Sequence, residues 1–249
     1  MWIRRFHRAR PDAPRLVCFP HAGGSASYFV PLSVAMGQSV EVLAIQYPGR
    51  QDRFDDPPIG SVTRLADVIS DELTDLLDKP LVLFGHSMGA NVAFEVAHRL
   101  GAGVRHLVCS ARLAPSRGQP ATLDLTDDRA LIQELHRLQG SAPGALDEEV
   151  MRLALPALRS DFLAVKGYRC PPDRRLSCPV TAFVGDDDSG VPVAEVQHWS
   201  GHTTDRFVLR RFPGGHHYLA HQWPTVADEL LAVLAPVCAP TTTERRNDR

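Results

Sequence analysis

Residues 81–95 read LVLFGHSMGANVAFE, and this stretch decides the fold. An apolar run of strand character stops at the pattern Gly-x-Ser-x-Gly, and an alanine-rich helical pattern follows directly. The two glycines of the pattern, Gly85 and Gly89, let the backbones of strand and helix pass close together. We therefore predict a sharp strand-to-helix turn that lifts the hydroxyl of Ser87 above the edge of a sheet, the arrangement called a nucleophile elbow.

The same turn places the backbone N–H of Met88 at the start of a helix. Unpaired donors and the helix dipole favour negative charge there, so we predict that this N–H is one donor of an oxyanion hole. The second donor in this layout comes from the loop after the first strand. Residues 15–20 form a short apolar run followed by His-Ala-Gly-Gly, so we expect the N–H of Ala22 to be that donor. We interpret His21 as a residue that fixes this loop.

The composition excludes several classes of protein. With 249 residues, of which 44% are hydrophobic and 22% charged, the chain can bury a core as one globular domain. Its formal charge of −2 gives no reason to expect nucleic acid binding. No segment reaches the length of a membrane span, and no apolar segment follows the basic N-terminus, so we predict no membrane contact and no export. The five cysteines lack metal-site spacing, which favours a reduced, cytoplasmic protein.

Strand-like and helical segments alternate along much of the chain. We predict strands at residues 15–20, 40–45, 81–86, 104–110, 179–184 and 206–212. Helical patterns separate most of them, the clearest being the stripe of Leu65, Ile69, Leu73 and Leu76. This alternation favours an α/β fold with a mostly parallel, doubly wound sheet that is covered on both faces.

Between about residues 113 and 175 the pattern changes to helices alone. Helix starts are predicted at residues 126–128 and 147–149, where acidic residues precede apolar stripes. Helices inserted at the edge where the elbow opens predict a lid, and the alternative is that they simply complete the globule. We predict a single domain over residues 1–239 and a polar, disordered tail over residues 240–249.

A serine nucleophile needs a base, and the base needs an acid that orients it. In a doubly wound hydrolase sheet the chain order is serine, acid, histidine. Three acids follow the strand at residues 179–184, namely Asp186, Asp187 and Asp188. We favour Asp188 because it lies far enough into the loop to reach the carboxyl edge of the sheet. The other two stay open as alternatives.

The base is predicted in the tight loop Pro-Gly-Gly-His that follows the last strand. This loop presents His216 first, so we favour it and expect His217 to face solvent. His86 precedes the nucleophile in a buried turn and is interpreted as structural. The remaining histidines have no spacing typical of metal ligands, so we predict neither a metal nor a cofactor.

Short motifs in a fixed order resemble the type II thioesterases, the stand-alone editing enzymes of polyketide synthase and nonribosomal peptide synthetase pathways. They are FPHAGGS at residues 19–25, YPGR at 47–50 with DR at 52–53, GHSMG at 85–89, FVGDDD at 183–188 and PGGH at 213–216 with YL at 218–219. The resemblance covers nearly the whole chain apart from the tail. It implies the α/β-hydrolase fold and a hydrolase that removes stalled or wrong acyl groups from the phosphopantetheine arm of acyl or peptidyl carrier domains.

Carried over position by position, the resemblance implies Ser87 as nucleophile, His216 as base and Asp188 as its orienting acid. It also implies that the N–H groups of Ala22 and Met88 form the oxyanion hole. The chain departs from the family where Ser189-Gly190 stands in place of the proline expected after the acid, which keeps the identity of the acid open. No cofactor is implied, and we expect a monomer.

Two other functions remain open on the same residues. The protein could be a general carboxylesterase or acyltransferase, or a catalytically inactive hydrolase fold that binds carrier domains. Four arginines, Arg50, Arg53, Arg112 and Arg117, are candidates for contact with an acidic carrier domain or with the pantetheine phosphate. The alternative for each is an arginine that is solvated or paired within the protein.

Overall fold

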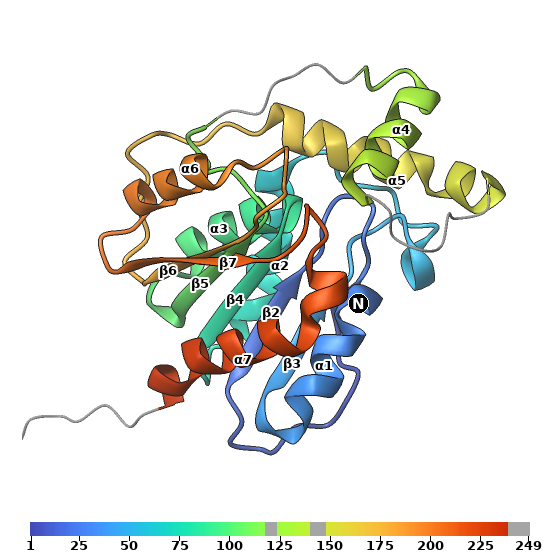
Figure 1. The fold of residues 1–249 in the computed structure, drawn as a ribbon. Helices are drawn as coiled ribbons and strands as arrows, with labels where there is room; N and C mark the ends of the chain where they lie inside the picture. Colours follow the sequence, from blue (N-terminus) through green and yellow to red (C-terminus); the bar gives the residue numbers. More distant parts are fainter. Residues whose placement is uncertain (118–123, 140–147, 239–249) are drawn as a thin grey trace, which may run out of the picture.

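A seven-stranded sheet forms the centre of the computed structural model, which describes residues 1–117, 124–139 and 148–238 (Figure 1). The strand order is β1-β3-β2-β4-β5-β6-β7. The strands are β1 (Ile3–Arg4), β2 (Arg15–Phe19), β3 (Glu41–Ile45), β4 (Leu81–His86), β5 (Val104–Ser110), β6 (Val180–Gly185) and β7 (Phe207–Phe212). Among the strand pairs of the described residues, only β1–β3 is antiparallel, so the mostly parallel sheet is confirmed. The sequence did not predict β1, because two residues carry no pattern.

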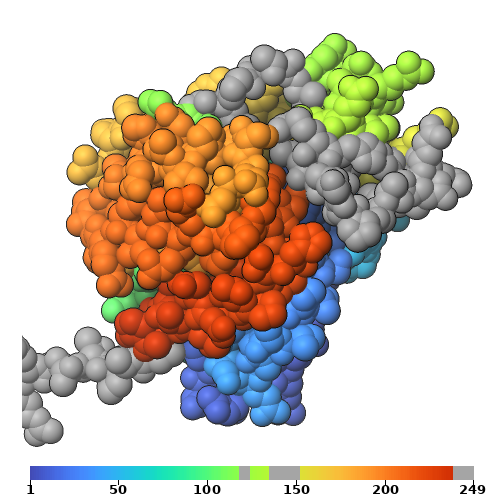
Figure 2. All heavy atoms as spheres, in the orientation of Figure 1, coloured from blue at the N-terminus to red at the C-terminus, as the bar shows by residue number. Residues whose placement is uncertain are grey.

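Helices cover both faces of the sheet. The helices are α1 (Val30–Met36), α2 (Val62–Thr74), α3 (Met88–Leu100), α4 (Asp128–Gln139), α5 (Glu148–Gly167), α6 (Val193–Val196) and α7 (Leu219–Cys238). One face carries α1 and α7, which pack side by side (Figures 1 and 2). The other face carries α2 and α3. The doubly wound arrangement follows from this division.

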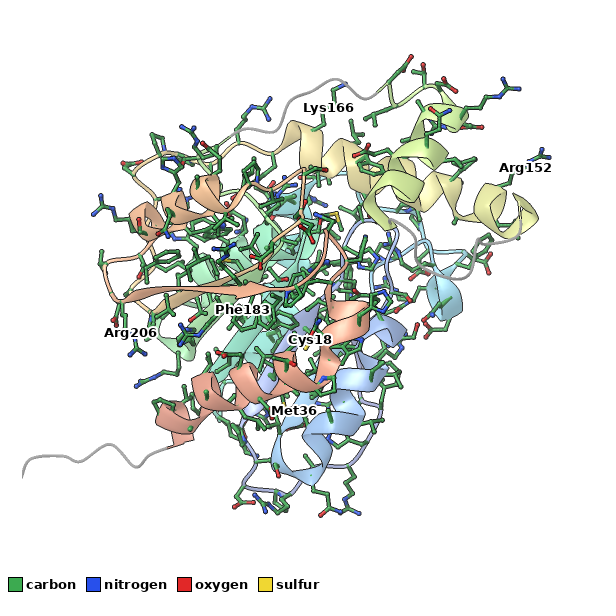
Figure 3. All side chains as sticks on the ribbon, in the orientation of Figure 1. Cys18, Met36, Arg152, Lys166, Phe183 and Arg206 are labelled. Atoms are coloured by element: carbon green, nitrogen blue, oxygen red, sulfur yellow. The ribbon has the colours of Figure 1, made fainter. Side chains whose placement is uncertain are left out.

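Alternating side chains of the strands divide the core into two layers. In β2, Leu16 and Cys18 pack on the side of α1 and α7, whereas Val17 and Phe19 pack on the side of α2 and α3. Figure 3 shows Cys18 and Phe183 in the interior, while Arg152 and Arg206 reach outward. In the described part of the chain, no helix is both long enough and apolar enough to cross a membrane.

The helices α4 and α5 are inserted between β5 and β6 and lie beyond the carboxyl edge of the sheet (Figure 1). As predicted, α4 begins at an acidic cluster, where the Asp127 carboxylate accepts a hydrogen bond from the Arg129 N–H at 2.9 Å. The second predicted start is also confirmed, since α5 begins at Glu148. The tail predicted at residues 240–249 lies outside the described residues.

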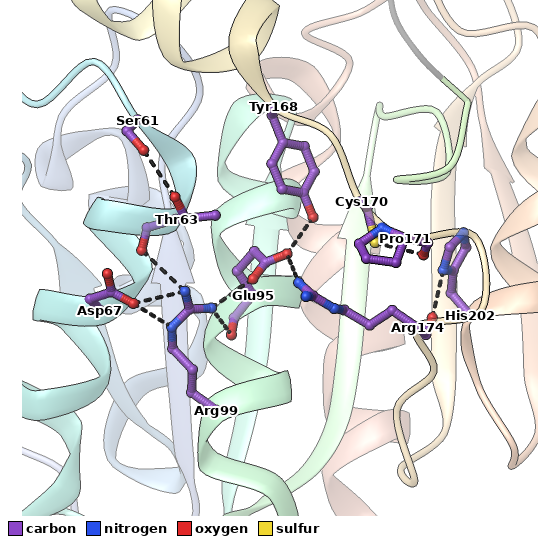
Figure 4. Close-up of polar contacts among 10 residues, drawn as sticks. All are labelled: Ser61, Thr63, Asp67, Glu95, Arg99, Tyr168, Cys170, Pro171, Arg174 and His202. Atoms are coloured by element: carbon purple, nitrogen blue, oxygen red, sulfur yellow. Dashed lines mark hydrogen bonds and ion pairs between the residues drawn. The ribbon is translucent and has the colours of Figure 1, made fainter.

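A buried carboxylate fastens the end of α5 to the elbow helix α3 (Figure 4). Glu95 of α3, 1% exposed, accepts hydrogen bonds from Tyr168 Oη at 2.7 Å and Arg174 Nη1 at 2.6 Å through one oxygen. Its other oxygen accepts from Arg99 Nη1 at 2.7 Å. Burial opposes ionisation of Glu95, but the hydrogen bonds with Arg99 and Tyr168 and the charge of Arg174 outweigh it and hold its pKa below the ordinary value.

Backbone contact without side chains sets the position of α3 against the sheet. A Cβ atom added to Gly89 would lie 2.1 Å from the carbonyl oxygen of Phe19, at the end of β2. A Cβ added to Gly85 would lie 2.3 Å from the carbonyl oxygen of Gly89. Both distances are far inside van der Waals contact, so the turn requires glycine at both positions, as the sequence predicts.

The substitution Gly89→Ala tests this contact. We expect it to lower the free energy of unfolding in urea by about 3 kcal/mol, because the new methyl group meets rigid backbone that cannot move aside. Gly167→Ala is the control, since a Cβ there meets no atom within 4 Å. The control should change stability by less than about 0.5 kcal/mol. Equal effects of the two substitutions would contradict the account.

The substitution Glu95→Gln tests the carboxylate network. Because the pKa of Glu95 is lowered in the folded protein, its charge stabilises the fold above the ordinary pKa of 4.5, and this contribution is lost as the pH falls below that value. At neutral pH we expect the variant to be less stable by about 2 kcal/mol. The difference between the two proteins should shrink as the pH falls below 4.5. A difference independent of pH would show that the charge is unimportant.

Candidate active site

Ser87 occupies the turn between β4 and α3 in a strained backbone conformation. Its φ of 54° and ψ of −119° lie where residues other than glycine are uncommon. Hydrogen bonds fix the turn, because the Ser87 N–H donates to the Ser110 carbonyl at 2.8 Å and the Ala90 N–H donates to the Ser87 carbonyl at 3.0 Å. The hydroxyl is therefore held at the carboxyl edge of the sheet.

The side chains of Ser87, His216 and Asp188 form one hydrogen-bonded chain. His216 Nδ1 lies 2.7 Å from Asp188 Oδ2, and His216 Nε2 lies 2.9 Å from Ser87 Oγ. An ionised carboxylate only accepts, so Nδ1 carries a proton and the Ser87 hydroxyl donates to Nε2 in the neutral ring. The structure thus brings together three residues that the sequence places after different strands.

Of the three candidate acids, Asp188 is the one that contacts the imidazole. It is buried, and its second carboxylate oxygen accepts the Gly190 N–H at 3.0 Å. Asp186 and Asp187 are exposed, and Asp186 pairs with Arg211 at 2.6 Å. The loop carries Asp188 inward and leaves its two neighbours at the surface, which favours the first choice made from the sequence.

A cavity of about 60 Å³ lies beside the Ser87 hydroxyl. Ala22 and Met88 line it together with Ser87 and His216. Among the described residues, neither the Ala22 N–H nor the Met88 N–H donates a hydrogen bond to another protein group. Two unpaired donors beside a hydroxyl can stabilise negative charge on an oxygen atom that enters the cavity.

The inserted helices supply the outer wall of this cavity. Glu134 comes from α4, and Phe162 and Val165 come from α5. A space of this size holds only a few non-hydrogen atoms next to Ser87. The position of α4 and α5 therefore limits what can bind.

Three further histidines pack beside His216. The ring centres of His21 and His217 are 4.5 Å apart, and those of His86 and His217 are 5.4 Å apart. Burial lowers the pKa of His217 to about 3 and also lowers the pKa of His21 and of His86 well below the ordinary value, so all three are neutral at neutral pH. His217 is partly exposed and lines the cavity, while its ring packs against His21, so it faces solvent only in part.

His86 is buried, and its Nδ1 lies 2.8 Å from Ser110 Oγ, an arrangement that suits the structural role expected from the sequence. Its Nε2, His21 Nδ1 and the Tyr28 hydroxyl have no hydrogen-bond partner in the described part of the chain. The described residues also include no group of three or more His, Cys, Asp or Glu side chains placed to hold a metal ion.

The four arginines considered from the sequence have different surroundings. Arg50 is buried and pairs with Asp161, so the alternative of pairing within the protein holds for it. The Arg53 side chain is 11% exposed, pairs with Asp56 and lies over the Trp2 ring. Arg117 is exposed and pairs with Glu195.

Arg112 is the one of the four whose side chain lines the cavity. With the Asn91 amide oriented so that its oxygen faces the guanidinium, that oxygen accepts from Arg112 Nε at 3.1 Å and from Nη2 at 3.0 Å. Burial lowers the pKa of the guanidinium to about 10, which still leaves it charged at neutral pH. Arg112 therefore places a positive charge in the wall of the cavity that Ser87 also lines.

Asp161 and Asn91 are not among the site residues predicted from the sequence. Asp161 lies on α5 within the run Ser160-Asp161-Phe162-Leu163, and its side chain is 2% exposed. A charged residue among the apolar positions of a helix indicates a buried partner. The sequence does not show that this partner is Arg50, because the two residues are 111 positions apart.

Comparison with known proteins identifies the family. Residues 14–234 match the thioesterase domain family. The chain is 48% identical over 239 residues to a probable cadicidin biosynthesis thioesterase of Streptomyces griseus, covering 94% of this chain and 66% of that protein. It is 46% identical over 236 residues to thioesterase PikA5 of Streptomyces venezuelae, covering 92% of this chain and 84% of that protein.

Solved structures agree with this assignment. The type II thioesterase BorB from the borrelidin biosynthetic cluster superposes with a TM-score of 0.86 at 43% identity, covering 96% of this chain and 98% of that one. YbtT, a type II thioesterase of the yersiniabactin pathway, gives a TM-score of 0.85 at 29% identity over 96% of this chain and 100% of that one. This chain therefore belongs to the thioesterase family and has the α/β-hydrolase fold.

Proposed function

We propose that this protein hydrolyses thioesters through a covalent acyl-enzyme intermediate on Ser87. The observation that carries the proposal is the hydrogen-bonded chain from Ser87 through His216 to Asp188. In this proposal Ser87 is the nucleophile, His216 is the general base and Asp188 orients the imidazole and stabilises its protonated form.

The reaction has two half-reactions. In the first, Ser87 Oγ attacks the thioester carbonyl while His216 takes its proton, and the N–H groups of Ala22 and Met88 stabilise the oxyanion. The carbon–sulfur bond then breaks, and the thiol leaves with the proton from His216. In the second, His216 removes a proton from water as the water oxygen attacks the acyl-enzyme carbonyl. His216 then returns the proton to Ser87 Oγ as the bond between carbon and Ser87 Oγ breaks and the carboxylic acid leaves.

The proposed substrates are acyl groups bound to the phosphopantetheine arm of acyl or peptidyl carrier domains. The support is the family, together with relatives whose names place them in polyketide and nonribosomal peptide biosynthesis. Arg112 suits a polar group of the arm or of the acyl chain, because its guanidinium lines the cavity. The proposal includes an editing role, a monomeric protein and a cytoplasmic location, which is where we expect such carrier domains.

The inserted helices serve as a lid in this proposal. Phe162 and Val165 close a cavity of about 60 Å³, so an acyl chain longer than a few carbons requires these helices to move. The Glu95 network anchors Tyr168, directly after α5, so in this proposal α4 and α5, including Phe162 and Val165, turn about that end when the lid opens. One domain over residues 1–239, with the lid within residues 113–175, is part of the same proposal.

The activity is tested with a carrier domain loaded with acetyl, propionyl or butyryl groups, followed by intact mass before and after addition of the protein. We expect loss of the acyl group, and Ser87→Ala should slow it on the order of 10³-fold or more, because the variant has no nucleophile. Nitrophenyl esters of the same acids are the control substrates. A strong preference for the oxygen esters would favour a general carboxylesterase, and unchanged thioester turnover by Ser87→Ala would contradict the mechanism.

The three aspartates of one loop provide a matched series. Asp188→Asn should lower kcat on the order of 10³-fold, since the amide cannot stabilise the imidazolium and favours the wrong ring tautomer. Asp186→Asn and Asp187→Asn should keep kcat within about 3-fold of the native value, because both side chains are exposed. A larger loss at either neighbour than at Asp188 would overturn the assignment of the acid.

A further inference from the structure

A buried ion pair connects Asp161 of the inserted helix α5 to Arg50, in the segment that follows β3. The side chains of Asp161 and Arg50 are 2% and 9% exposed. Asp161 Oδ2 accepts from Arg50 Nη1 at 2.7 Å, and Oδ1 accepts from Arg50 Nη2 at 2.9 Å. Two parallel hydrogen bonds of this kind fix the relative orientation of both groups.

The pair also binds the backbone of a second segment, the loop that follows β2, at two successive residues. Asp161 Oδ2 accepts the Gly23 N–H at 2.8 Å, and Arg50 Nη1 donates to the Gly24 carbonyl at 2.9 Å. Ala22, the proposed oxyanion donor, directly precedes Gly23. The ion pair therefore holds one donor and one acceptor of the segment that carries the Ala22 N–H.

One hydrogen bond closes this segment into a turn, from the Gly24 N–H to the His21 carbonyl at 2.9 Å. Gly23 has a φ of 75°, in the region that favours glycine, and Gly24 follows it, so the backbone here has wide conformational freedom. An oxyanion donor is effective only when it is fixed before charge develops. In this turn with two glycines, the contacts from Asp161 and Arg50 add to the hydrogen bond within the turn and restrict it further.

We propose that Asp161 and Arg50 are positioning residues that hold the loop of Ala22 and Gly23 in its active geometry, so that the oxyanion hole is complete only while α5 is seated. The inference rests on the proposed function of Ala22. Since Asp161 belongs to α5, displacement of this part of the helix removes the acceptor of the Gly23 N–H. The position of α5 thus controls the reactivity of Ser87 as well as access to it.

Single and double substitutions separate positioning from stability. Asp161→Ala removes the ion pair with Arg50 and the hydrogen bond from the Gly23 N–H. Asp161→Asn keeps an oxygen that can accept the Gly23 N–H. The pair Arg50→Met with Asp161→Leu replaces the buried charges by apolar groups, which folded proteins often tolerate. Arg159→Gln is the matched control, because Arg159 also lies on α5 but pairs with Asp128 at the surface. All variants are assayed well below their melting temperatures, measured by circular dichroism.

Two readouts are compared, namely thioester kinetics and the affinity of propylboronic acid, which adds to a serine hydroxyl and presents an oxygen to the oxyanion hole. For Asp161→Ala and the double variant we expect kcat and boronic acid affinity to fall together by about 10- to 100-fold, with KM within about 2-fold. Asp161→Asn should retain more of both than Asp161→Ala, and Arg159→Gln should resemble the native protein.

Several results would overturn the proposal. They are an unchanged boronic acid affinity in folded Asp161→Ala and double variants, a rise in KM at constant kcat, or an equal loss in Arg159→Gln. The affinity for propylboronic acid depends on Ser87 and on the loop of Ala22, not on the natural substrate. Ser87→Ala is the negative control for this measurement, because it has no hydroxyl to which the boronic acid can add. If the native protein failed to hydrolyse carrier thioesters, the proposed function would fail while the boronic acid series still tested the loop.

Discussion

The close approach of α3 to the end of β2 is the constraint on which the rest of the structure depends. Gly89 brings the first turn of the helix against the Phe19 carbonyl, and Gly85 allows the helix to pass over β4. This contact fixes Ser87 in its strained conformation and sets the Met88 N–H beside the loop of Ala22. The side chains of His216 and Asp188 then meet Ser87 at the position that this backbone contact sets.

The parallel sheet then supplies the other groups at the same edge. Since the carboxyl ends of parallel strands meet, the loops after β6 and β7 bring Asp188 and His216 to Ser87. The neutral histidines around His216 leave the Asp188 carboxylate as the charged group in contact with its ring. Of the other charged residues described above, Arg112 and Glu134 line the cavity, and the Arg50–Asp161 pair contacts the loop of Ala22.

The sequence predicts what depends on local pattern. The order of strands and helices, the turn at Ser87 and the loop positions of Asp188 and His216 follow from periodicity, glycine spacing and chain order. It does not predict β1, the packing of His217 against His21 or the Arg50–Asp161 pair, because these are contacts between segments far apart in the chain. The arginines show this limit of sequence-based prediction, because the sequence does not distinguish their surroundings. In the structure Arg50 forms a buried ion pair, Arg112 lines the cavity and Arg117 forms an ion pair at the surface.

The central claim is that the acyl group passes through the oxygen of Ser87. Rapid mixing of the protein with an acyl carrier thioester, acid quenching within the first turnover and mass spectrometry of the digested protein test it most directly. The account predicts a transient mass increase equal to the acyl group on the peptide containing Ser87. Thioester hydrolysis without any acylated peptide, or with the acyl group on another residue, would contradict it.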